Sequence, residues 1–127
     1  DYLKADRNAY YRLAPALDDS CIDCVSLEDA WCHNDLRLLR LFKKTKVVLG
    51  VVNSSSSRVE TVEQIRRRIA CALRHIPAER LQVAPDCGLA LLQGAYKPKL
   101  IQKLKNMCIA AKMVAVPPVG PTAAPAS

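Results

Sequence analysis

The chain has 127 residues, of which 50% are hydrophobic and 24% are charged, and this is an ordinary composition for one soluble globular domain. Its longest apolar stretches fall well short of the roughly 20 residues that a membrane-spanning helix needs, so we expect neither a membrane protein nor a wholly disordered chain. The net charge is +7, but the basic residues are spread over several predicted elements. We therefore interpret the charge as a solvated basic surface, with no nucleic-acid partner.

The first residue is Asp1, and no secretory leader is visible, so we expect a cytoplasmic protein whose true N-terminus lies upstream. Six cysteines would suit a disulfide framework in a small secreted protein. We favour reduced thiols, because Cys71 and Cys108 lie on apolar faces of predicted helices and Cys21 and Cys24 lie within a predicted strand. The sequence thus predicts that these four are small buried hydrophobes.

The first predicted element is a helix over residues 2–17, with Pro15 breaking the helical pattern near its end. Residues 21–27 form a near-continuous apolar run, which predicts a short strand buried on both faces. This strand delivers Glu28 and Asp29 at its carboxyl end.

Asn34 or Asp35 is a suitable cap for a short helix that we expect to reach Phe42. The β-branched run 47–52 is the clearest strand in the sequence, and a polar run from Asn53 to Ser57 follows it.

Thr61 and Gln64 have the spacing of a capping box, which predicts a helix that ends at Ile76, before Pro77. The remaining expectations are a strand at 81–84, a turn at 85–88, a helix at 98–113 and a disordered tail rich in proline and alanine.

We expect three segments: an N-terminal helix and linker at 1–20, the folded α/β region at 21–114 and the tail at 115–127.

Three successive strand–helix units favour a parallel α/β sheet with crossover helices. Three parallel strands cannot close on themselves, so the pattern indicates either a small open α/β sandwich or a portion of a larger barrel. Sheet edges would be exposed in either case.

Polar clusters follow each of the three predicted strands, at the edge where parallel α/β proteins gather their functional side chains. Glu28 and Cys87 are chemically compatible as zinc ligands, and Cys32 and His33 are further candidates. Other interpretations stay open at this point. On the residues alone, the favoured role of Glu28 is to cap the next helix or to pair with an arginine, and Cys87 is equally suited to be a buried cysteine in a turn.

The amino-acid sequences of six segments resemble those of one family. This family is the C-terminal catalytic domain of cobalamin-independent methionine synthase and its shorter relatives, and the resemblance covers roughly residues 20–114. The most specific stretch runs from Ile-Pro-Ala-Glu-Arg-Leu to Pro-Asp-Cys-Gly. The matching residues, in chain order, are 26–30, 34–36 with Leu39 and Phe42, 48–52, 58–60 with 62–63, 76–81 and 84–89.

This resemblance implies a TIM-type (β/α)8 barrel, of which the chain holds the C-terminal three βα units, so the barrel is incomplete. It also implies a zinc ion held by a His-x-Cys pair, a glutamate matching Glu28 and a cysteine matching Cys87. The His-x-Cys pair belongs to the strand before Glu28, and nothing in residues 1–20 matches it. The expected zinc ligand set is therefore incomplete in this chain.

The activity that the resemblance implies is zinc-dependent methyl transfer to a thiol, with homocysteine as the acceptor and a methyl-tetrahydrofolate as the donor, as in methionine biosynthesis. Asn53-Ser54-Ser55 stands where the full-length synthases carry an aspartate and, two residues on, a histidine, which leaves another donor or acceptor open. The chain alone is expected to be inactive. The alternatives are a catalytically inactive partial barrel or interaction module, and exposed barrel edges would favour self-association.

Overall fold

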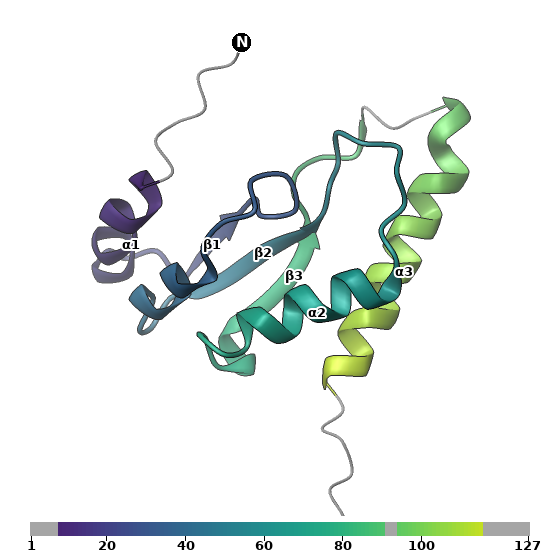
Figure 1. Cartoon of the computed structure of the whole chain (residues 1–127). Helices are drawn as coiled ribbons and strands as arrows, with labels where there is room; N and C mark the ends of the chain where they lie inside the picture. The colour runs from purple at the N-terminus through teal and green to yellow at the C-terminus, as the bar shows by residue number, and fades with distance from the viewer. Residues whose placement is uncertain (1–7, 91–93, 116–127) are drawn as a thin grey trace, which may run out of the picture.

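The computed structural model describes residues 8–90 and 94–115, and it forms a small sheet with helices packed against it (Figure 1). The start of the predicted N-terminal helix, at residues 2–7, lies outside the described residues. The predicted tail also lies outside them, apart from Ala115, which ends the last helix.

The sheet has three parallel strands in the order β1-β2-β3, as the alternation of strands and helices predicts. The strands are β1 (Cys24–Leu27), β2 (Lys46–Val52) and β3 (Leu81–Pro85). Leu27 is level with Leu49, which in turn is level with Val83, so side chains from all three strands lie in rows across the sheet. All three strands consequently end at the same edge of the sheet.

One face of the sheet carries the hydrophobic core. Val47 and Leu49 of β2 are at most 1% exposed and pack with Leu27 of β1. The helices α2 (Val62–Ala72) and α3 (Lys97–Ala115) contact each other and β2 on this side (Figure 1).

The opposite face is open in the described part of the chain. The row of side chains on this face consists of Ser26, Val48 and Gln82, one from each strand. Ser26 on β1 and Gln82 on β3 are exposed. The expectation that β1 is buried on both faces is therefore wrong. The strand lies at an edge of the sheet, and only one of its faces has helices or loops packed over it.

The buried environment predicted for the cysteines is also wrong for three of the four. Cys24 opens β1 on its exposed face, Cys21 precedes the strand, and Cys108 lies on the outer side of α3, so all three are exposed. Only Cys71 packs partly against the core. An apolar run identified the strand but did not determine which of its faces would be covered.

The helix α1 (Ala9–Asp19) continues through Pro15 rather than ending there. Its last turn is held by Asp18, whose carboxylate accepts hydrogen bonds from the amides of Lys44 and Thr45 at 3.1 and 2.9 Å. This long-range contact, together with the burial of Ala14, outweighs the one backbone hydrogen bond that a proline removes from a helix.

The helix α2 begins where the capping box predicts. The Thr61 hydroxyl accepts from the Gln64 amide at 3.1 Å, and the Gln64 side chain accepts from the Thr61 amide at 3.0 Å. It ends at Ala72, four residues earlier than expected, because Pro77 disfavours helical backbone at Ile76 and the chain turns before it.

The segment predicted as a helix up to Phe42 is a short 3-10 helix, η1 (Leu36–Leu41), capped by Asp35. Two further single turns are η2 (Ala78–Arg80) and η4 (Gly94–Tyr96). Among the helices of residues 8–90 and 94–115, none combines the length and the apolar character that crossing a bilayer would demand.

Candidate functional site

The loops that follow the three strands meet at the carboxyl edge of the sheet. Because the strands are parallel, the polar residues after β1, β2 and β3 are brought together although they are far apart in sequence. The three polar clusters predicted from the sequence lie at this edge, and hydrogen bonds between their residues join all three.

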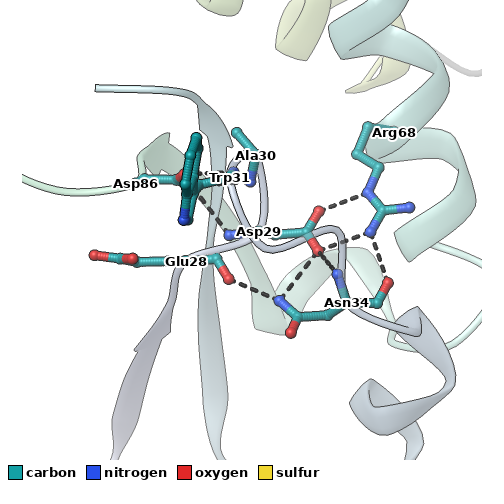
Figure 2. Close-up of polar contacts among 7 residues, drawn as sticks. All are labelled: Glu28, Asp29, Ala30, Trp31, Asn34, Arg68 and Asp86. Atoms are coloured by element: carbon teal, nitrogen blue, oxygen red, sulfur yellow. Dashed lines mark hydrogen bonds and ion pairs between the residues drawn. The ribbon is translucent and has the colours of Figure 1, made fainter. Parts of the chain in front are cut away.

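Asp86 connects the end of β3 to the loop after β1. Its Oδ1 accepts hydrogen bonds from the amides of Asp29 and Ala30 at 3.0 and 2.9 Å, and its Oδ2 accepts one from the Trp31 amide at 2.8 Å (Figure 2). The Asp86 side chain is 7% exposed. One carboxylate therefore binds three consecutive backbone donors, and hydrogen bonds to a charged acceptor are about twice as strong as neutral ones.

Gly50 of β2 leaves the space that this contact requires. A Cβ atom at Gly50 would lie 2.2 Å from Oδ1 of Asp86 and 2.8 Å from its Cα. Both distances are shorter than non-bonded atoms tolerate, so a glycine is needed where β2 passes under the Asp86 carboxylate.

Asp29 holds the other side of the same loop. Its carboxylate is completely buried and pairs with Arg68 of α2, with Nε and Nη2 at 2.5 and 2.7 Å. Its Oδ1 also accepts from the amide and the side chain of Asn34 (Figure 2). The loop after β1 is thus fixed from two directions.

Glu28 differs from its neighbour. Its side chain is exposed and extends away from the pair of Asp29 and Arg68 (Figure 2). The arginine pairing considered for Glu28 belongs to Asp29 instead, and Asp35 caps the helix η1. The Glu28 backbone carbonyl accepts from Asn34 Nδ2 at 2.7 Å, which fixes the main chain from which the exposed carboxylate projects.

Cys87 directly follows Asp86 and is exposed at the same edge. Its Sγ lies 2.8 Å from the hydroxyl oxygen of Ser54, a buried residue in the loop after β2. Cys87 is therefore not the buried turn cysteine of the alternative interpretation, because the residue is exposed and its sulfur has a hydroxyl beside it.

Cys32 and His33 do not complete a cluster with these residues. Cys32 is half-buried, and His33 is exposed with a backbone φ of 48°. Across residues 8–90 and 94–115, no group of three or more histidine, cysteine, aspartate or glutamate side chains is arranged to hold a metal ion. The suggestion that Cys32 and His33 are further ligands is not supported by their placement.

The loop after β2 is fixed by a buried lysine that sequence reasoning missed. Lys103 of α3 is completely buried, and its Nζ donates to the Asn53 carbonyl at 2.8 Å and to Glu60 Oε2 at 3.0 Å. Glu60 in turn accepts from the Asn53 amide. The sequence could have indicated this burial, because Lys103 lies between Leu100 and Met107 on the apolar face of its helix.

A cavity of about 360 Å³ opens beside this loop. It lies between the loops after β1 and β2 and the first turns of α2. The residues that line it include Asp29, His33, Glu60, Gln64 and Arg68. Two of its acidic groups, Asp29 and Glu60, already have cationic partners.

Fold and site together define a class: a parallel α/β domain with an exposed carboxylate and an exposed cysteine, Glu28 and Cys87, at the carboxyl edge of the sheet. Residues 7–113 match the family model described as "Cobalamin-independent synthase, Catalytic domain". The chain belongs to this family, as the sequence motifs predict.

Similar proteins of known name agree with the family. A methionine synthase of Thermococcus kodakarensis is 35% identical over 109 residues, which cover 84% of this chain and 32% of that protein. A 5-methyltetrahydropteroyltriglutamate–homocysteine methyltransferase of Halalkalibacterium halodurans is 32% identical over 107 residues, or 81% of this chain and 14% of that protein. The chain thus spans about a third or less of these relatives.

Among solved structures, the chain resembles a B12-independent methionine synthase from Shewanella sp. W3-18-1 in complex with selenomethionine. The TM-score is 0.76 and the sequence identity is 28%, over 84% of this chain and 30% of that one. The parallel three-stranded arrangement is accordingly one that a solved member of the family shares.

Proposed function

We propose that the chain forms the C-terminal three βα units of a TIM-type barrel that transfers a methyl group to a thiol. The family match over residues 7–113 supports this, as does the open sheet face of Ser26, Val48 and Gln82. In a closed barrel this face would line the interior, which is filled by side chains from all strands. Residues 21–114 would be the barrel portion.

Glu28 and Cys87 are the residues that we propose as metal ligands. A carboxylate oxygen and a thiolate sulfur are both ligands that zinc accepts, and both side chains are exposed at one edge of the sheet. The donor types therefore fit zinc. The described residues supply only part of a ligand set, so the remaining ligands would come from outside them.

When bound, zinc would lower the pKa of a thiol substrate such as homocysteine and make it a better nucleophile towards a methyl donor such as a methyl-tetrahydrofolate. The chain's own residues would hold and orient the centre. Cys87 and Glu28 would bind the metal ion, and the Ser54 hydroxyl lies within hydrogen-bonding distance of the Cys87 sulfur. The cytoplasmic location stays a prediction.

The observation that carries the proposal is that the two residues matching the family's ligands both lie exposed at one edge of the sheet. In the longest form of the protein that its gene encodes, we expect one zinc ion per chain by titration with elemental analysis. Cys87→Ala or Glu28→Ala should abolish stoichiometric zinc, whereas Cys108→Ala and Glu79→Ala, which alter exposed residues elsewhere, should not. Stoichiometric zinc in either ligand variant would contradict the assignment.

The second candidate is a partial barrel without catalysis that acts as an interaction module. It is favoured by the incomplete ligand set and by Asn53 and Ser55 at the positions where full-length synthases carry an aspartate and a histidine. An absence of tight zinc binding in the longest native form would select this candidate. We further propose that the exposed apolar side of α3 lets chains self-associate.

A further inference from the structure

We propose that Asp86 is a positioning residue, which keeps the loop after β1, beginning at Glu28, in a fixed position relative to Cys87. The proposal rests on the zinc centre proposed above, and it concerns a residue outside the ligand set. Asp86 is adjacent in sequence to Cys87, and its carboxylate binds the chain directly after Glu28. The Asp86 side chain therefore connects the two proposed ligands, because Cys87 is the next residue and the bound Asp29 amide directly follows Glu28.

The contact spans the whole sheet. Asp86 follows β3, the amides that it binds follow β1, and β2 lies between these strands. The Asp86 amide itself donates to the Val52 carbonyl at 2.9 Å, so the backbone of Asp86 is tied to the central strand. Because both its backbone and its side chain are bound, the residue transmits the position of β3 to the loop after β1.

Gly50 supports the same interpretation independently. The strand β2 is otherwise rich in β-branched residues, and a glycine weakens a strand interior. Here the missing Cβ is what admits the Asp86 carboxylate, and the Gly50 carbonyl accepts a further hydrogen bond from the Ala30 amide at 3.0 Å. The strand therefore has its least strand-favouring residue at the place where the carboxylate crosses it.

The ion pair of Asp29 and Arg68 does not replace this function. It attaches the loop to α2, on the core side of the sheet, whereas Asp86 attaches the loop to the strand that precedes Cys87. Loss of the Asp86 carboxylate should thus leave the loop attached to α2 and, through the Ala30 amide, to Gly50 of β2, but no longer held against β3 and Cys87.

The first test measures hydrogen exchange of single amides in the 127-residue chain, which needs no metal. In Asp86→Asn, the side-chain NH2 cannot accept a hydrogen bond, so at least one of the three amides loses its acceptor. We expect exchange at Asp29 or Trp31 to accelerate by about tenfold or more, whereas Ala30 keeps the Gly50 carbonyl as an acceptor and the amide of Leu49 in the central strand remains protected. The matched control is Asp19→Asn, at an exposed aspartate that lies before β1.

A second variant, Gly50→Ala, keeps the carboxylate and displaces it. It should accelerate exchange at the same amides, so the test stays decisive if Asp86→Asn folds poorly. Unchanged protection at both Asp29 and Trp31 in a folded Asp86→Asn or Gly50→Ala chain would overturn the proposal.

The third measurement separates positioning from a purely structural role. With Zn²⁺ alone as the probe, in the longest native form of the protein, Asp86→Asn should weaken binding by about 10- to 100-fold, as the loss of a residue supporting metal ligands generally does. Asp19→Asn should bind like the parent. Equal zinc affinity in Asp86→Asn and the parent, despite faster exchange, would refute the positioning role. If the parent binds no zinc, the proposed function fails, and with it the role of Asp86 towards a metal, whereas the exchange data still decide whether the loop is held.

Discussion

Two buried carboxylates, Asp18 and Asp86, act alike at opposite ends of the sheet. Each accepts hydrogen bonds from consecutive backbone amides of a segment far away in sequence, before β2 for Asp18 and after β1 for Asp86. Burial by itself would raise the pKa of Asp18, but the amides of Thr45 and Lys44 outweigh it and hold this pKa well below its usual value. Ionised Asp18 is therefore favoured by the folded state.

At the residue scale, we expect Asp18→Asn to lower the free energy of unfolding at pH 7 by about 1–3 kcal/mol, since hydrogen bonds to a charged group are lost. Because the folded-state pKa of Asp18 is depressed, its contribution is present above the unfolded-state pKa of about 3.9 and fades as the pH falls below it. Urea unfolding at pH 7, 5 and 3 checks this. The exposed Asp19→Asn is the control, and a deficit that stays constant down to pH 3 would contradict the prediction.

At the scale of elements, α2 is the helix that the chain specifies most completely by itself. Its N-terminus has a reciprocal capping box, and Ile65, Ile69 and Ala72 form its buried side. It also carries Arg68, which reaches Asp29 in the loop after β1. The start of α2 therefore sets where Arg68 meets the candidate site.

We expect Thr61→Ala to lower the free energy of unfolding by about 1 kcal/mol, because the Gln64 amide loses its side-chain acceptor. Thr61→Ser keeps the hydroxyl and should stay within about 0.5 kcal/mol of the parent. Chemical denaturation of the three proteins measures this. Equal stability of the alanine and serine variants would show that the box contributes little.

At the scale of the whole molecule, two surfaces stand exposed in the part of the chain that the structure describes. One face of the sheet is open, and the outer side of α3 presents an apolar groove lined by Ile101, Leu104 and Ile109 among others. Ile101 and Ile109 are 44% and 48% exposed. Exposed apolar side chains that cluster along one helix are suited to pack against another chain, so we expect this side of α3 to be the contact surface.

We expect the 127-residue chain to self-associate with increasing concentration, as measured by sedimentation velocity. Ile109→Lys should shift the equilibrium several-fold towards the monomer, because a charge in an apolar contact is costly to desolvate. Gln102→Lys adds the same charge at an exposed position outside the groove and should have little effect. If the parent is monomeric at all concentrations, or if both variants behave alike, α3 is not the contact surface.

The sequence by itself determined those features that depend on neighbouring residues. The β-branched run predicted β2, the spacing of Thr61 and Gln64 predicted the start of α2, and the alternation of elements predicted a parallel sheet. The motifs around Glu28 and Cys87 indicated the family, and the family model confirms it. Whether these two residues bind zinc stays a prediction.

Only the tertiary structure decided how the loops are held. The contact between Asp86 and Asp29 joins residues 57 positions apart, and it uses backbone amides, which every residue other than proline possesses and which leave no mark on the sequence. The burial of Lys103 and the open face of β1 depend likewise on which elements pack against them. Local patterns specify elements, whereas the partners of a buried charge are set only when distant segments meet.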